Sequence, residues 1–149
     1  MKRYLRIIMP ILAFLVVIFI LSNSFSNSTT ANEKRDFVVK TVTGKTFSQR
    51  VLSSVAKLFH MMEYAAFSFC LTSSVFLLGN GLKNRFERIL LCGMTLALTD
   101  ELIQTMFSGR GSRVTDVLVD TAGIMVGYAV VIVITKILAK RNEQKRKES

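Results

Sequence analysis

The sequence predicts an all-α, polytopic membrane protein with about four transmembrane helices. Half of its 149 residues are hydrophobic, and they come in long unbroken blocks separated by short charged stretches. A soluble domain of this length would spread its apolar residues in amphipathic patterns, whereas a helix that spans a bilayer needs ~20 mostly apolar residues. Lys and Arg lie mainly in the flanks of the blocks, where they fix the orientation of membrane proteins.

Four apolar blocks define the expected transmembrane helices. The first, 7–21, follows a basic start and would also suit a signal peptide. The residues after it offer no good small-x-small cleavage site, so we expect a retained helix. The other blocks are 58–78, 89–107 and 117–138.

The segments between the blocks carry loop and turn signals. Ser, Asn and Thr dominate 22–32, which indicates a loop, and Gly79-Asn80-Gly81 indicates a turn after the second block. The stretch from Val51 to Lys57 suits a short interfacial helix. The sequence therefore predicts a transmembrane domain over 1–138, with an extracytoplasmic loop over 22–57, and a basic cytoplasmic tail over 139–149.

The distribution of basic residues predicts that both termini are cytoplasmic. In a four-helix arrangement one side of the membrane holds 12 Lys and Arg residues and the other holds 8. The richer side is cytoplasmic under the positive-inside rule. Its members are Lys2, Arg3, Arg6, Lys83, Arg85, Arg88, Lys136, Lys140, Arg141, Lys145, Arg146 and Lys147.

Two other features exclude alternative classes. The positive charge lies beside apolar blocks rather than in a separate basic surface, so we expect no nucleic-acid partner. Cys70 and Cys92 each stand alone inside an apolar block. A disulfide framework and a cysteine metal site are therefore not expected, and both side chains suit small hydrophobic positions.

Charged and polar residues inside the apolar blocks are the candidate functional residues. A charge at the centre of a bilayer costs roughly 2.5–3.5 kcal/mol on insertion scales, so such residues mark functional sites. They are His60 and Glu63 in the second block, Asp100, Glu101 and Gln104 in the third, and Asp116 and Asp120 in the fourth.

These residues share one depth in the membrane and one face of each helix. At ~1.5 Å per residue, those of the second and third blocks lie within roughly 11 Å of the outer surface. Asp120 is one turn deeper than Asp116. Spacings of three or four residues keep each set on a single helix face. We therefore expect a polar pocket in the outer leaflet, with Arg110 at its mouth.

The expected pocket has more acids than bases. Five carboxylates face only Arg110, Arg113 and His60. Five acids in a low dielectric cannot all be ionised without partners. Some are protonated, or a cation or a cationic group of a ligand lies among them. A divalent cation held by the carboxylates and the histidine is one alternative.

Structural roles compete with functional ones at several of these positions. Asp116 suits the N-cap of the fourth helix. Gln104 suits a hydrogen bond between helices, and Gly123 with Gly127 suits close helix packing. Tyr64 suits either a packing role or a hydroxyl group inside the pocket.

Two motifs resemble the VanZ-like family. The run DELIQTMFSGR from Asp100 to Arg110, then DVLVDTAG from Asp116 to Gly123, resembles D-E-x-x-Q-x-F-x-P-G-R followed by D-x-x-x-D-x-x-G. The stretch KLFHMMEY from Lys57 is similar to K-x-x-H-x-x-E-Y. Ser108 replaces the favoured Pro and Met106 the favoured Phe, which affects the expected shape of the short link between the last two helices.

The resemblance implies a bacterial cell-membrane protein that affects susceptibility to teicoplanin, with membrane lipids as partners. The resemblance also implies an enzymatic activity on lipid head groups or lipid-linked phosphates. In such an enzyme Arg110 would bind the phosphate, and His60 with Glu63 would form a base and its orienting group. Asp100 or Glu101 would be a second acid or base. A non-catalytic protein, whose pocket is structural or binds lipid or lipoglycopeptide, is the alternative.

The charge distribution generates a test of topology. A reporter that is active only in the cytoplasm should be active when fused after Ser149 and inactive when inserted near Thr29, because the 12-to-8 bias places both termini inside. Activity of the Thr29 insertion would reverse the orientation and move the pocket to the inner leaflet.

Overall fold

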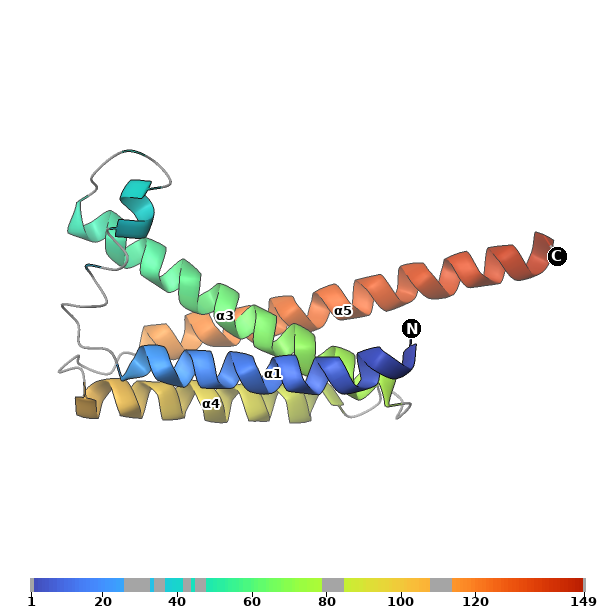
Figure 1. The fold of residues 1–149 in the computed structure, drawn as a ribbon, viewed down its shortest axis with the longest axis horizontal. Helices are drawn as coiled ribbons and strands as arrows, with labels where there is room; N and C mark the ends of the chain where they lie inside the picture. The colour runs from blue at the N-terminus through green and yellow to red at the C-terminus, as the bar shows by residue number, and fades with distance from the viewer. Residues whose placement is uncertain are drawn as a thin grey trace.

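The computed structural model describes residues 2–25, 33, 37–41, 44, 48–78, 85–107 and 114–148, and the regular secondary structure among these residues is helix. Four long helices form a bundle (Figure 1). They are α1 (Lys2–Ser24), α3 (Gln49–Leu77), α4 (Arg85–Phe107) and α5 (Val114–Glu148). Residues 37–41 form a short helical segment between α1 and α3.

The prediction of an all-α membrane protein is confirmed. Among the described helices, α1, α4 and α5 are long and apolar enough to cross a membrane. The chain is a multi-pass membrane protein. The mean hydropathy of α3 is lowered by His60, Glu63 and several Ser and Thr residues. A fourth membrane span through α3 therefore stays a prediction.

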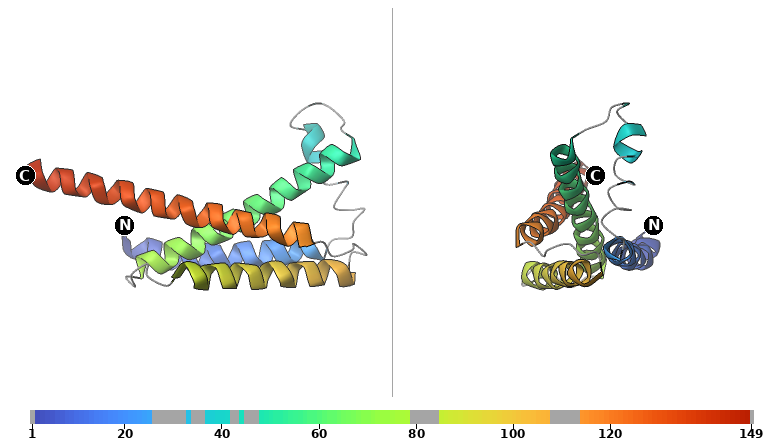
Figure 2. Two further views of the ribbon diagram at one scale, coloured as in Figure 1. Left: turned by 180° about the vertical axis from the view of Figure 1, so that it is seen from behind. Right: turned by 90° about the vertical axis from the view of Figure 1, so that its left-hand side faces the viewer.

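The helices run in alternating directions, so the N-terminus of α1 and the C-terminus of α5 point toward the same end of the bundle (Figure 1). The end of α1, the end of α4 and the start of α5 meet at the opposite end. The view from behind shows α3 crossing α5 (Figure 2). α3 packs most extensively against α5 and next against α1. It is therefore the helix on which the bundle is assembled.

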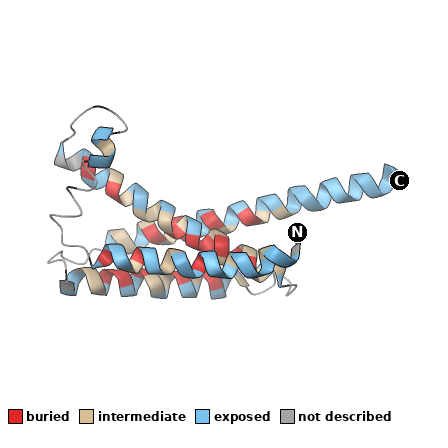
Figure 3. Ribbon diagram, viewed as in Figure 1, coloured by how far each residue is buried: buried red, intermediate tan, exposed pale blue. Residues whose placement is uncertain are grey.

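The last part of α5 leaves the bundle. Residues 136–148 are exposed on every side of the helix (Figure 3). Buried positions are confined to the half of α5 that crosses α3. The predicted basic tail is thus the continuation of the fourth helix and not a separate segment.

Other helix boundaries also differ from the expected ones. α1 continues through Ser22, Asn23 and Ser24, and α3 begins at Gln49 rather than Leu58. The expected loop over 22–24 is therefore helical, and the helix expected from Val51 to Lys57 is present as the continuous start of α3. The expected turn at 79–81 and the link over 108–113 lie outside the described residues.

Glycines on α5 allow the close crossing with α3. A methyl group at Gly123 would overlap the backbone carbonyl oxygen of Met61, and one at Gly127 would overlap that of Ala65. The predicted packing role of this glycine pair is confirmed. The Ser68 hydroxyl adds a 2.7 Å hydrogen bond to the Ile124 carbonyl oxygen across the same contact. Small residues and polar side chains are the usual means of joining helices in lipid, where apolar burial supplies no driving force.

A small apolar core lies beside this crossing. Its buried members come from all four helices and are Ile20, Tyr64, Phe67, Ile89, Ala97 and Ile124. Leu91, Met106 and Val133 are large apolar residues on the outside of the bundle. Such a surface suits contact with lipid chains. At the end remote from the acidic residues, Arg85 donates a 2.9 Å hydrogen bond to the Val75 carbonyl oxygen and joins α4 to α3.

The glycine contact gives a stability prediction. Gly127→Leu should destabilise the detergent-solubilised protein by ~1–3 kcal/mol, because the new side chain has no space beside Ala65. Ala129→Leu, at an exposed position on the same helix, is the matched control and should leave the melting temperature unchanged. Equal melting of the two variants would contradict the packing described for α3 and α5.

Candidate functional site

The structure gathers carboxylates from three helices at the end of the bundle where α5 begins. Glu63 lies on α3, Asp100 and Glu101 on α4, and Asp116 and Asp120 on α5. The other four carboxylates all act electrostatically on Asp120. These five carboxylates, from helices far apart in the sequence, therefore lie near one another in the fold. We call these five residues the acidic cluster.

Asp100 is the most enclosed member of the cluster and joins α1 to α4. Its side chain is buried. One carboxylate oxygen accepts a hydrogen bond from the Ser24 hydroxyl, and the other accepts one of 2.9 Å from the Gln104 amide. The Ser24 hydroxyl also lies 2.9 Å from the Ile20 carbonyl oxygen. Gln104 thus supports Asp100 from within the same helix, one turn away.

His60 and Glu63 lie together on α3, as their spacing predicted. The distance between His60 Nδ1 and Glu63 Oε2 is 3.6 Å. The Asn23 amide of α1 donates a 3.1 Å hydrogen bond to the other oxygen of Glu63. This arrangement fixes the carboxylate from one side and leaves it beside the imidazole. Long distances between a base and its orienting group are usual before a substrate binds.

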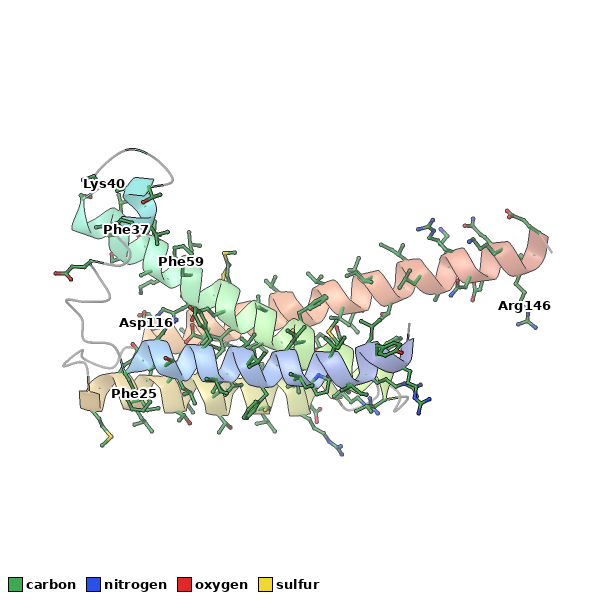
Figure 4. The ribbon with its side chains drawn as sticks, in the orientation of Figure 1. Phe25, Phe37, Lys40, Phe59, Asp116 and Arg146 are labelled. Atoms are coloured by element: carbon green, nitrogen blue, oxygen red, sulfur yellow. The ribbon has the colours of Figure 1, made fainter. Side chains whose placement is uncertain are left out.

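Asp116 forms an ion pair with Lys57, the first residue of the stretch similar to K-x-x-H-x-x-E-Y. The distance between Lys57 Nζ and Asp116 Oδ1 is 2.7 Å. Asp116 lies in the first turn of α5, which begins at Val114, so the expected N-cap role is wrong. A carboxylate there still interacts favourably with the helix dipole. Figure 4 labels Asp116 at this end of the bundle.

Asp120 and Tyr64 are buried polar groups that lack hydrogen-bond partners. Within the described part of the chain, no hydrogen-bonding group reaches Asp120 Oδ1 or the Tyr64 hydroxyl. Asp100 and Asp120 both act electrostatically on that hydroxyl, so it faces the acidic cluster. A buried polar group without a partner costs ~1–3 kcal/mol. Such a cost is typical of sites kept for chemistry or binding rather than for stability.

Two residues that contact the acidic cluster, Asn23 and Ser24, were not among the predicted site residues. Both were assigned to a loop because Ser and Asn favour loops. Lys57 was named only as part of the stretch similar to K-x-x-H-x-x-E-Y. One signal was available for Asn23 and Ser24. The block 7–21 is shorter than the ~20 residues of a full span, so its helix had to continue into 22–24.

Other expectations fall outside the described residues or find no support within them. Arg110, the expected phosphate ligand, and Arg113 both lie outside the described residues. Where side chains are described, no group of three or more His, Cys, Asp or Glu residues is arranged to hold a metal ion. The chemistry of the described site is therefore that of carboxylates, one imidazole, one lysine and hydroxyl groups.

A comparison with protein families identifies one match. The family model described as VanZ/LLP1 matches residues 7–135. This range contains every candidate site residue and the bundled parts of the four helices. Neither a curated protein nor a solved structure matches the chain.

The link between Ser24 and Asp100 gives a prediction about stability. Ser24→Ala should lower the free energy of unfolding by ~1–3 kcal/mol, because it leaves a buried carboxylate oxygen without its donor. Ser22→Ala, an exposed position on the same turn of α1, should have no effect. Thermal melting in detergent compares the two, and equal melting temperatures would show that the Ser24 contact does not hold α1 to α4.

Proposed function

The chain belongs to the VanZ/LLP1 family, and from that premise we propose that its acidic cluster acts on lipid head groups or lipid-linked phosphates of the outer leaflet. In this proposal the partners are membrane lipids, the location is the bacterial cell membrane, and both termini are cytoplasmic. The activity alters susceptibility to glycopeptides of the teicoplanin type.

One observation carries the proposal. Asp100 and Asp120 are buried on facing helices, and neither has a Lys or Arg partner among the residues described. Buried acids whose role is only structural are normally paired with cations, because an unpaired charge in a low dielectric is costly. An arrangement that concentrates acids, and in which Asp120 Oδ1 and the Tyr64 hydroxyl find no hydrogen-bond partner among the described residues, is better suited to a reaction or a ligand.

The residues of the cluster supply the parts of an acid–base site. His60 would accept a proton from an attacking hydroxyl or water, and Glu63, held by Asn23, would orient the imidazole. Closely spaced carboxylates hold protons between them, since like charges oppose full ionisation. Asp100 or Glu101 would donate such a proton to the leaving oxygen, with Gln104 and Asp120 as neighbours. Arg110 remains the proposed phosphate ligand.

The arrangement of the helices supports the proposed orientation. Both termini point toward one end of the bundle, and the acidic cluster lies at the other (Figure 1). The basic residues Arg3, Arg6, Arg85 and Arg88 begin α1 and α4 at the end with the termini. That end suits the cytoplasmic leaflet, so the cluster would face outward.

A non-catalytic role has its own supporting observation. Ser24 contacts Asp100 and Asn23 contacts Glu63, so the cluster also joins α1 to α3 and α4. A structural network of this kind, or a site that only binds lipid or lipoglycopeptide, is the alternative function. A catalytic cluster and a structural cluster differ in how the protein responds when one ionisable group is removed.

The proposed chemistry predicts loss of function without loss of structure. His60→Ala and Glu101→Gln should abolish the effect of the protein on teicoplanin susceptibility. Both variants should still insert and should melt within a few degrees of wild type, because Glu101→Gln keeps shape and removes only the ionisable group. Glu87→Gln, an exposed position in the first turn of α4, is the matched control and should keep full function.

The other outcomes are equally informative. Poor insertion or much earlier melting of both variants would assign the cluster to structure. Stable variants with full function would show that the cluster is not the functional site. A comparison of lipid extracts from cells with and without the protein, by mass spectrometry, would then identify which lipid class changes.

A further inference from the structure

Lys57 stands at the outer edge of the acidic cluster. It lies on α3, one turn before His60, and its ammonium group contacts Asp116 on α5. The side chains of this pair are 38% and 34% exposed, whereas Asp100 and Asp120 are buried. Lys57 is therefore a partly exposed cation beside a group of buried acids.

The depth of Lys57 suits the phosphate layer of a membrane. Asp116 precedes Asp120 by four residues, which is ~6 Å along a helix axis. Lys57 and Asp116 therefore lie about one helical turn closer to this end of the bundle than Asp120 does. A lipid phosphate bound at the level of Lys57 would not contact the deeper carboxylates. The ester bonds beside that phosphate would lie near them.

The surface beside Lys57 is apolar and exposed. Leu58 and Met62 on α3 are 56% and 63% exposed, and Phe59 projects from the same helix (Figure 4). These residues continue the helix surface toward the middle of the bundle. An acyl chain lying along them would bring the head group of its lipid to Lys57.

The ion pair itself is of a kind that can exchange partners. Exposed Lys–carboxylate pairs contribute little net stability, because solvent screens both charges. Lysine binds phosphate as a compact point charge with three donors. If Lys57 turned to a phosphate, Asp116 would keep its place at the start of α5, where the helix dipole and the Thr115 hydroxyl, at 3.3 Å, interact with it.

We propose that Lys57 binds the phosphate of a membrane lipid and that Asp116 is its counter-ion when no lipid is bound. This inference rests on the proposed function and adds a positioning role within it. It explains how a site rich in acids accepts an anionic substrate. The cation holds the phosphate at the rim, and the acids meet the neighbouring bonds.

The test is a binding measurement on the full-length protein in a neutral detergent. The probe is dioctanoyl phosphatidylglycerol, and dioctanoylglycerol, which lacks the phosphate, is the parallel ligand. Lys57→Gln should weaken binding of the phospholipid by roughly tenfold or more, because a charge-assisted contact is lost. Lys57→Arg should retain most of the binding. Lys40→Gln, an exposed lysine on the short segment 37–41, is the matched control and should bind as wild type does.

Asp116→Asn separates this proposal from a structural ion pair. If Asp116 competes with phosphate for Lys57, the variant should bind the phospholipid about two- to fivefold more tightly. If Lys57 only neutralises Asp116, the affinity of Asp116→Asn for the phospholipid should equal that of wild type. Unchanged or weaker binding by Asp116→Asn would overturn the proposal, as would wild-type binding by Lys57→Gln.

Two further arms fix the ligand class and separate this inference from the proposed function. Equal binding of dioctanoylglycerol, or binding of inorganic phosphate as tight as that of the phospholipid, would overturn the assignment to a lipid phosphate. The measurement needs no turnover. Phospholipid binding through Lys57 would therefore stand even if Glu101→Gln kept full function, and loss of function in Glu101→Gln would stand even if Lys57 proved irrelevant to binding.

Discussion

The close contact between α3 and α5 is the constraint on which the rest of this structure depends. Carboxylates inside a membrane must face other helices rather than lipid, because hydrocarbon offers neither hydrogen bonds nor counter-charge. Gly123 and Gly127 bring the backbone of α5 against Met61 and Ala65. That approach places Asp120 beside the α3 face that carries Tyr64, and it draws α4 with its two acids against the same crossing. The acidic cluster is a consequence of how closely two helices meet.

The two ends of the bundle differ in chemistry. At one end three acids, Asp100, Glu101 and Asp120, are buried, and the ion pair of Lys57 with Asp116 lies at the rim. At the other end the helices begin or leave with Arg and Lys, and α5 continues as an exposed charged helix beyond the bundle (Figure 3). Basic flanks favour the cytoplasmic side. In the proposed topology, this separation of charge sets the basic end in the cytoplasmic leaflet and the acidic cluster in the outer leaflet.

Helix packing and the proposed chemistry draw on the same cluster of residues. Asp100 is well supported by Ser24 and Gln104, and its contacts hold α1 to α4. Asp120 and Tyr64, close by, have buried polar atoms without partners among the described residues. A network with both kinds of member is rigid where the helices are joined and retains unsatisfied groups where a ligand would bind. In the proposed mechanism Asp100 therefore combines a structural contact with its acid role, and the unsatisfied oxygens of Asp120 and Tyr64 lie beside it.

The sequence by itself determined the class of the protein, the approximate positions of its helices, and the polar residues that would gather at one end. Block length, positive flanks and the spacing of His60 with Glu63 are local properties, so they can be counted along the chain. The contacts of Asn23 with Glu63 and of Ser24 with Asp100, the pairing of Lys57 with Asp116 and the unsatisfied Oδ1 of Asp120 were decided only by the tertiary structure. Each depends on which helix lies opposite. Block length alone extends α1 to residue 24, but no pattern along one chain segment contains the carboxylate on another helix that accepts the hydrogen bond of Asn23 or Ser24.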